Sequence, residues 1–280
     1  MSIDRRDFLK SLGGICAAVG LSAAAGAVVP GRLEASSGGT ALEDATAGSA
    51  VRWGMAINTR LFTSDADFDR CQEACHSIHN VPNFGNIKDE IKWCWKATYH
   101  EAYPSKAAQF LPEGADERGA LVMCNHCENP PCVRACPTKA TFKAANGITM
   151  MDMHRCIGCR FCMAACPFGA RSFNWRNPRV SPTELYGGRQ ITPEFPTRER
   201  GVVEKCNFCQ ERIASGPVPM KGEELSEAQM PACVLAAPKG ALTFGNLKDP
   251  SSKVRQMLNE NHSITRKSEA GTNPSIFYIL

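Results

Sequence analysis

The sequence predicts an α+β fold in which short strands lead into cysteine-rich loops and short helices leave them. Twelve of the 15 cysteines fall into three groups of four. Residues 52–57 and 201–204 are rich in apolar and β-branched side chains, and an Asn-Gly turn at Asn146 precedes a similar stretch over 148–151. Such stretches are typical of strands. We therefore expect three short strands close to the cysteine loops.

Two of the cysteine groups are unbroken runs with the spacing of iron–sulfur ligands. The first is Cys124-x2-Cys127-x4-Cys132-x3-Cys136-Pro137, and the second is Cys156-x2-Cys159-x2-Cys162-x3-Cys166-Pro167. A cubane cluster needs four thiolates from a loop that wraps it, and in bacterial runs closed by Cys-Pro the fourth cysteine ligates the other cluster of a pair.

The exchange of closing cysteines assigns two [4Fe-4S] clusters. Cluster A is predicted on Cys124, Cys127, Cys132 and Cys166. Cluster B is predicted on Cys156, Cys159, Cys162 and Cys136. Residues 120–175 are therefore interpreted as a two-cluster ferredoxin unit.

A third copy of the run follows with one ligand missing. The segments after Cys136 and Cys166 share a proline, an alanine and a phenylalanine, and Pro238, Ala241 and Phe244 repeat them after Cys233. Ala237 stands where the closing cysteine of this copy is expected.

A fourth, more degenerate copy lies upstream. Cys71 and Cys75 have the spacing of the last two cysteines of a run, and Asp65 and Phe68 stand where the first two are expected. If the outer runs exchange ligands as the inner two do, one outer cluster would retain Cys71 alone and is expected to be absent. The other, cluster C, keeps four ligands: Cys206, Cys209, Cys233 and Cys75. The sequence therefore predicts three clusters in tandem bicluster ferredoxin-like units.

Other uses of the cysteines explain the pattern less well. Paired Cys-x2-Cys motifs also form zinc sites, and exported chains with many cysteines often form disulfides, but neither explains two Cys-Pro closures with exchanged ligands. Cys71-x3-Cys75-His76 resembles a spaced-out haem attachment motif, yet cluster C already requires Cys75. Cys71 and Cys94 remain as buried thiols or a disulfide.

The N-terminal residues 1–27 have the features of a twin-arginine export signal. Arg5 and Arg6 precede a charge-free stretch rich in Ala and Gly, and Ala25-Gly26-Ala27 offers a small-residue cleavage site. This route carries folded proteins, which suits a chain whose clusters are inserted in the cytoplasm. We expect a periplasmic protein, with residues 28–50 as a linker.

Charge and composition exclude several functions. The formal charge of +4 falls to about +3 without the signal, and about two negative charges on each oxidised cluster bring the holoprotein to about −3. This charge does not support a nucleic-acid partner. No stretch after the signal approaches the roughly 18 apolar residues of a membrane span. Because no open iron site or nucleotide, flavin or pterin motif is evident, we expect an electron-transfer subunit without catalytic residues.

The remaining boundaries follow from the runs. Residues 51–119 form the first outer ferredoxin half, 176–200 a Pro-rich insertion, 201–248 the second outer half and 249–280 a C-terminal tail. The Pro-rich insertion and the segment 215–230 are candidate docking surfaces or solvated loops. We interpret the six histidines as structural or solvent-facing, and the four tryptophans as core residues.

The order of these motifs resembles the four-cluster ferredoxin subunits of bacterial molybdopterin oxidoreductases and related membrane complexes. The motifs are CNHCENPPCVRACP, CIGCRFCMAACPFGAR and KCNFC followed by PACV. Within that superfamily, CHSIHNVP, IKWCW and Ala237 are most similar to DsrO, the periplasmic subunit type of the Dsr MKJOP complex of sulfur-metabolising prokaryotes. The resemblance implies an NrfD-type, quinone-interacting membrane partner (DsrP-like) and a multihaem cytochrome c partner (DsrJ-like). The alternative is the ferredoxin subunit of another periplasmic reductase, of the polysulfide, nitrite or molybdopterin type.

Overall fold

The computed structural model describes residues 50–104, 119–178, 192, 195 and 198–280. The predicted export signal, nearly all of the linker and most of the Pro-rich insertion lie outside the described residues. Within the described part, no helix has the length and apolar character required to cross a membrane.

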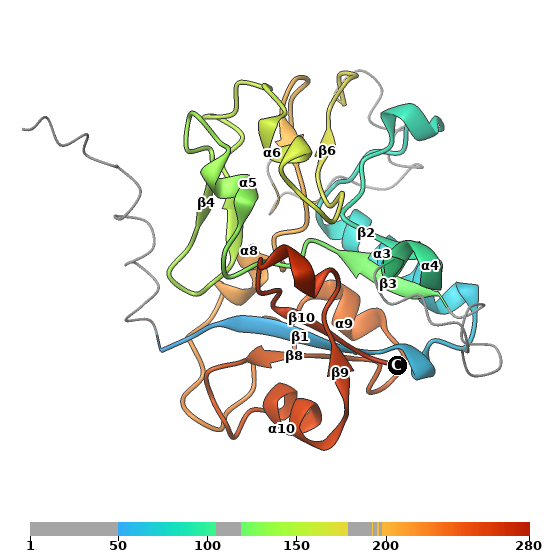
Figure 1. Cartoon of the computed structure of the whole chain (residues 1–280), viewed down its shortest axis with the longest axis vertical. Coiled ribbons are helices and arrows are strands. Elements are labelled where there is room, and N and C mark those ends of the chain that lie inside the picture. Colours follow the sequence, from blue (N-terminus) through green and yellow to red (C-terminus); the bar gives the residue numbers. More distant parts are fainter. Residues whose placement is uncertain (1–49, 105–118, 179–191, 193–194, 196–197) are drawn as a thin grey trace, which may run out of the picture. The chain divides into compact units, whose positions relative to one another are not determined.

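A four-stranded sheet joins the beginning and the end of the described chain (Figure 1). Its order is β8 (Leu242–Asn246), β1 (Trp53–Asn58), β10 (Ile276–Ile279) and β9 (Ser263–Ile264). β1 is antiparallel to β8 and parallel to β10. The segment 249–280, expected only as a tail, therefore contributes two strands of this sheet and the helix α10 (Lys253–Glu260).

The two faces of β1 pack against different groups. Trp53, Met55 and Ile57 belong to the large core that also contains many of the cysteines, whereas Ala56 packs with Val254 of α10. This alternation follows from the two-residue period of a strand. Both faces of β1 are covered, which explains why its side chains are almost all buried.

Three short strand pairs surround the cysteine loops. β2 (Cys94–Ala97) pairs with β3 (Ala120–Met123), β4 (Thr141–Lys143) with β5 (Thr149–Met151), and β6 (Ser172–Phe173) with β7 (Val203–Glu204). The strands predicted over 52–57, 148–151 and 201–204 are confirmed as β1, β5 and β7. Small mixed sheets with few helices agree with the α+β class.

The helices are short except for one. α5 (Pro131–Arg134), α6 (Phe161–Ala164) and α9 (Ala232–Ala236) each carry the third cysteine of a run, and α8 (Gln210–Ile213) follows Cys209. α4 spans Tyr99–Ala102, and short 3-10 turns span Thr59–Leu61, Ile87–Asp89 and Ser268–Ala270. The degenerate first run forms α3 (Asp65–Ile78), a helix of 14 residues.

Backbone conformation repeats between the cysteine runs. Two residues after the first cysteine of each run, His126, Gly158 and Phe208 all have positive φ. Three residues after the closing position, Lys139, Gly169 and Gly240 do so as well. Since positive φ is unusual for any residue but glycine, the recurrence at non-glycine positions indicates one loop shape used three times. The third copy keeps this shape although Ala237 has replaced its closing cysteine.

Candidate metal centres

The described cysteines carry free thiols, most of them buried. No disulfide joins Cys71 to Cys94, so the structure agrees with the buried-thiol interpretation of these two residues. In the part of the chain described here, no three or more His, Cys, Asp or Glu side chains surround a single metal-ion position.

Four thiols from the two inner runs form group A, comprising Cys124, Cys127, Cys132 and Cys166. Burial raises the pKa of Cys127 to about 12, and the neighbouring thiols of Cys124, Cys132 and Cys166 act in the same direction. Burial and the thiol of Cys124 likewise raise the pKa of Cys166. These thiols become ligands only as thiolates, so the group requires a compensating positive charge, which iron would supply.

Group B is the predicted ligand set Cys136, Cys156, Cys159 and Cys162, of which the structure brings Cys136, Cys156 and Cys162 together. Cys162 interacts electrostatically with Cys156 of its own run and with Cys136 of the preceding run. The backbone N–H of Thr141 donates to Cys136 Sγ at 3.5 Å, and that of Val203 donates to Cys156 Sγ at 3.5 Å. Amide donors to cysteine sulfur stabilise thiolate charge and tune cluster potential. Cys136, Cys156 and Cys159 are only half-buried.

Group C joins residues from distant parts of the chain: Cys75, Cys206, Cys209 and Cys233. Burial raises the pKa of Cys233 well above its ordinary value, and the thiols of Cys209, Cys75 and Cys206 reinforce the rise. The N–H of Phe208 donates to Cys206 Sγ at 3.4 Å. Helix α3 therefore brings Cys75 to the third run.

A fifth thiol, Cys94, lies near group C, as does the thiol of Cys71. A hydrogen bond with Cys94 and complete burial hold the pKa of Cys75 well above its ordinary value. The Cys94 thiol also donates to the Cys71 carbonyl oxygen at 3.8 Å. Sequence reasoning did not find this proximity, because it depends on the pairing of β2 with β3, where Cys94 lies opposite Met123.

The three groups are connected in the order C, A, B. Cys206 of group C interacts electrostatically with Cys124 of group A as well as with Cys75. Cys132 of group A interacts in the same way with Cys162 of group B. Group A therefore lies between the other two.

The two upstream positions that lack a cysteine, Asp65 and Phe68, make other contacts. Phe68, where the second cysteine of the first run is expected, is buried and stacks on Phe62 at 4.6 Å between ring centroids. Asp65 lies at the start of α3 and pairs with Lys96. The first run is a continuous helix and lacks the loop turn seen in the other runs.

Buried polar side chains surround groups A and B. The residue Arg171 is 5% exposed, and its Nη1 donates to Thr141 Oγ1 at 3.2 Å. It also interacts electrostatically with Cys132, while its Nη2 has no hydrogen-bond partner among the described protein atoms. The sequence contained a signal for this residue, the Gly-Ala-Arg that follows the closing Cys166-Pro167, but its burial was not foreseen.

Rings fill the space between the main sheet and the loops of groups A and C. His126 stacks on Phe208 at 3.7 Å, Phe208 contacts Phe244 edge-on at 5.2 Å, and Phe244 stacks on Trp53 at 5.5 Å. His126 is fully buried, and the same burial holds its pKa well below the ordinary value. The packing agrees with a structural role for this histidine and for Trp53, whereas Trp175, expected in the core, is exposed.

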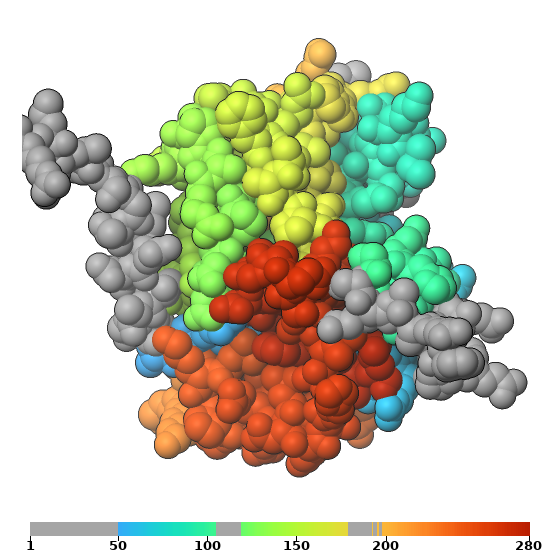
Figure 2. Space-filling model, viewed as in Figure 1, coloured from blue at the N-terminus to red at the C-terminus, as the bar shows by residue number. Residues whose placement is uncertain are grey.

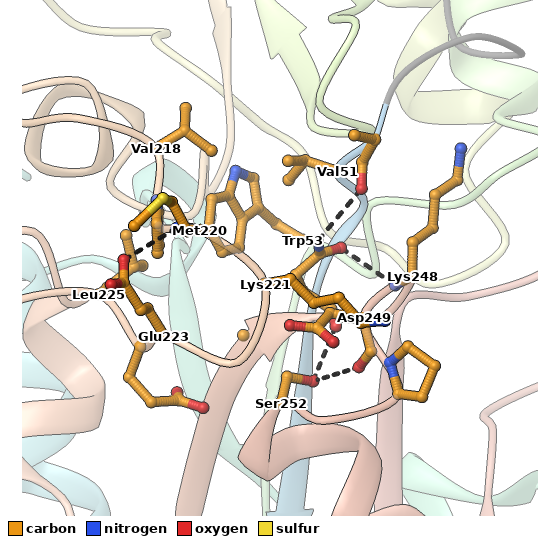
Figure 3. A pocket seen from close by; sticks show the side chains of 16 residues that line it. Val51, Trp53, Val218, Met220, Lys221, Glu223, Leu225, Lys248, Asp249 and Ser252 are labelled. Carbon is orange, nitrogen blue, oxygen red and sulfur yellow. Dashed lines mark hydrogen bonds between the residues drawn. The ribbon is translucent and has the colours of Figure 1, made fainter.

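Trp53 also lines a pocket of about 560 Å³ (Figure 3). Val218, Met220 and Leu225 supply apolar walls, and the side chains of Lys221, Glu223, Lys248 and Asp249 add charges of both signs. None of the predicted cluster ligands lines it. The segment 215–230, expected as a docking surface or a solvated loop, forms much of its wall.

The donor set fits iron–sulfur clusters. Each group supplies four cysteines, and the loops repeat one backbone shape. Amide N–H groups also point at sulfur in groups B and C.

Comparison with known proteins agrees with this chemistry. Residues 121–189 match the family model described as a 4Fe-4S dicluster domain. The chain is 39% identical over 245 residues to the Hdr-like menaquinol oxidoreductase iron-sulfur subunit 1 of Archaeoglobus fulgidus, covering 81% of this chain and 82% of that protein. It is 30% identical over 241 residues to the menaquinone reductase iron-sulfur cluster-binding subunit of Nitratidesulfovibrio vulgaris, covering 82% and 89%.

Protein NrfC of Escherichia coli is 29% identical over 280 residues, which cover 100% of this chain and 96% of that protein. The class defined by the fold, the cysteine groups and these relatives is that of iron–sulfur subunits of larger redox complexes. The chain belongs to the iron–sulfur subunit family that includes subunit 1 of the Hdr-like menaquinol oxidoreductase.

Proposed function

We propose that the chain binds three [4Fe-4S] clusters and relays single electrons along them. Cluster A has the ligands Cys124, Cys127, Cys132 and Cys166. Cluster B has the ligands Cys136, Cys156, Cys159 and Cys162. Cluster C has the ligands Cys75, Cys206, Cys209 and Cys233.

The observation that carries this proposal is the position of Cys206, which interacts with both Cys75 of its own group and Cys124 of group A. With Cys132 beside Cys162, the groups form an uninterrupted series from C through A to B. A series of adjacent one-electron centres suits transfer between two partners better than chemistry on a substrate. The chain has no substrate site of its own in this proposal.

The partners we propose are a quinone-interacting membrane subunit of the NrfD type and a periplasmic multihaem cytochrome c. Relatives named as a menaquinol oxidoreductase subunit and a menaquinone reductase subunit support the quinone side. The twin-arginine pattern at Arg5 and Arg6 supports a periplasmic location, and the DsrO-like motifs support a role in dissimilatory sulfur metabolism.

A second candidate is the ferredoxin subunit of a different periplasmic reductase. The arsenate respiratory reductase iron-sulfur protein ArrB of Shewanella sp. is 34% identical over 235 residues, which cover 75% of this chain and 89% of that protein. A catalytic molybdopterin subunit in the native complex would favour this candidate over the cytochrome-linked one.

The test is anaerobic purification of the native complex followed by rapid-freeze EPR after addition of a menaquinol analogue. We expect the cluster signals of this subunit to appear before the haems of the complex are reduced and to decay as electrons pass on. Clusters that stay oxidised while the haems are reduced would exclude the chain from the route.

A further inference from the structure

Three large apolar side chains are exposed beside group B. Ile157 is 68% exposed, Phe161 is 62% exposed and Trp175 is 45% exposed. Ile157 lies between Cys156 and Cys159, Phe161 begins α6 directly before Cys162, and Trp175 follows β6. The segment of α6 and β6 faces the viewer in Figures 1 and 2. We call Ile157, Phe161 and Trp175, together with Arg160, the cluster B face.

The cluster B face is held in place by its own contacts. The ring of Trp175 meets Phe173 edge-on at 4.5 Å, and the guanidinium of Arg160 lies 4.7 Å from the Trp175 ring centroid and 5.4 Å from that of Phe173. A surface fixed before binding loses little conformational entropy when a partner docks. Exposed aromatic and aliphatic groups gathered in this way mark an interaction site more often than single exposed residues do.

Group B is also the most accessible of the three groups. Three of its cysteines are half-buried, whereas every cysteine of group C is buried. A pocket of about 520 Å³ beside the face is lined by Cys156, Ile157 and the methionines Met150, Met151 and Met153. Methionine side chains adapt to the shape of a partner, so this pocket suits an inserted side chain close to a cluster ligand.

The rim of the cluster B face is mainly basic. The exposed cations that neighbour the ligands, the face or the pocket in sequence or in space are Arg134, Lys139, Arg155, Arg160, Arg176 and Arg200. The acids here are Asp152, which pairs with Arg155 at 3.2 Å, Asp89, which pairs with Arg176 at 2.7 Å, and the pocket residues Glu199, Glu204 and Glu211. Because the holoprotein carries a net charge of about −3, this basic rim is a local feature and not a consequence of overall basicity.

We propose that the cluster B face docks a redox protein that is apolar at the exposed edge of its own cofactor and acidic around that edge. The apolar centre excludes water next to group B, and the basic rim steers and orients the acidic partner. This inference rests on the proposed electron-transfer function and adds the place where electrons enter or leave through cluster B.

Site-specific photo-cross-linking in the native complex tests the proposal. A benzoylphenylalanine replaces Phe161 or Trp175, and the matched control replaces Met220, which is apolar and 72% exposed in the pocket of Figure 3. We expect positions 161 and 175 to cross-link to a cofactor-carrying subunit with acidic residues around the cross-linked site, and position 220 not to do so. Cross-links to a second copy of this chain, to a basic surface, from position 220 alone, or none would overturn the proposal.

Charge reversal provides a second test. The double variant Arg134→Glu with Arg155→Glu should slow second-order electron exchange with the purified partner about tenfold or more at low salt and weaken its salt dependence. Arg60→Glu, an exposed control remote in sequence from group B, should leave the rate unchanged. Equal rates for the double variant and the control would contradict the proposal.

Absence of reducible clusters would overturn the proposed function, whereas three reducible clusters without cross-links from 161 or 175 would overturn only this inference.

Discussion

The thiol of Cys75 on helix α3 interacts electrostatically with the thiol of Cys206 in the loop after β7. Cys71 lies one helical turn earlier on α3 and near the same group, with a buried thiol. The two cysteines therefore provide a matched pair for testing which one is a ligand.

We predict that Cys75→Ser loses or converts cluster C, because serine is a poor ligand for iron in a cubane. Iron should fall by up to about four per chain, and the EPR signal of one cluster should disappear or change to that of a three-iron form. Cys71→Ser should retain the full iron content. Loss of a whole cluster from Cys71→Ser would contradict the ligand assignment, and Cys94→Ser serves as the control for the fifth thiol.

Restoring the missing cysteines should not restore a fourth cluster. The triple change Asp65→Cys, Phe68→Cys and Ala237→Cys leaves α3 as a continuous helix and removes the buried stack of Phe68 on Phe62. Loss of a buried phenylalanine costs about 3–5 kcal/mol when truncated to a small residue, so the variant should be less stable while its iron content stays the same. A rise of about four irons per chain would show that the region still folds around a cluster.

Arg171 should raise the reduction potential of the clusters next to it. Its buried guanidinium lies near Cys124 and Cys132 of group A and Cys162 of group B, and reduction adds negative charge there. In Arg171→Gln we expect at least one cluster to become harder to reduce, by on the order of 60 mV, equivalent to a tenfold change for one electron. Arg171→Lys should lower the reduction potential less, and Arg155→Gln, a change at an exposed arginine, should have little effect on it. An EPR redox titration measures all three, and an unchanged potential in Arg171→Gln would contradict the prediction.

A buried ion pair should be important for stability. Arg198 Nε donates to the Glu204 carboxylate at 2.7 Å with both side chains fully buried, and Trp93 Nε1 donates to the same carboxylate at 2.6 Å. Glu204→Ala leaves the guanidinium uncompensated and should cost about 3–5 kcal/mol. The partly exposed pair of Glu90 and Lys92, at 3.2 Å, is the control, and Glu90→Ala should cost no more than about 1 kcal/mol. Denaturant unfolding, followed by near-ultraviolet circular dichroism, measures the free energy of unfolding of both variants. Equal losses of stability in Glu204→Ala and Glu90→Ala would contradict this prediction.

The sequence predicted what depends on local spacing. The cysteine intervals and the turn at Asn146 act over a few residues, and the repeated pattern around Ala237 marked the third copy although its closing cysteine is absent. The strands β1, β5 and β7 were also predicted, because each is marked by a short stretch of apolar and β-branched residues.

Features that depend on distant contacts were missed. Nothing local indicates that β10 lies parallel to β1, because that pairing joins residues from opposite ends of the described chain. Cys94 reaches group C only through the pairing of β2 with β3, and the burial of Arg171 depends on loops from both inner runs. The register of strands and the burial of a charge depend on tertiary contacts. Composition and residue spacing alone therefore do not predict them.

Iron and acid-labile sulfide per chain, measured on anaerobically purified holoprotein together with an EPR redox titration, test the central claim most directly. The three-cluster assignment predicts about twelve irons, about twelve sulfides and three reducible cubane signals. About sixteen irons with a fourth signal would contradict the loss of the outer cluster, and zinc or disulfides in place of iron would contradict the electron-transfer function itself.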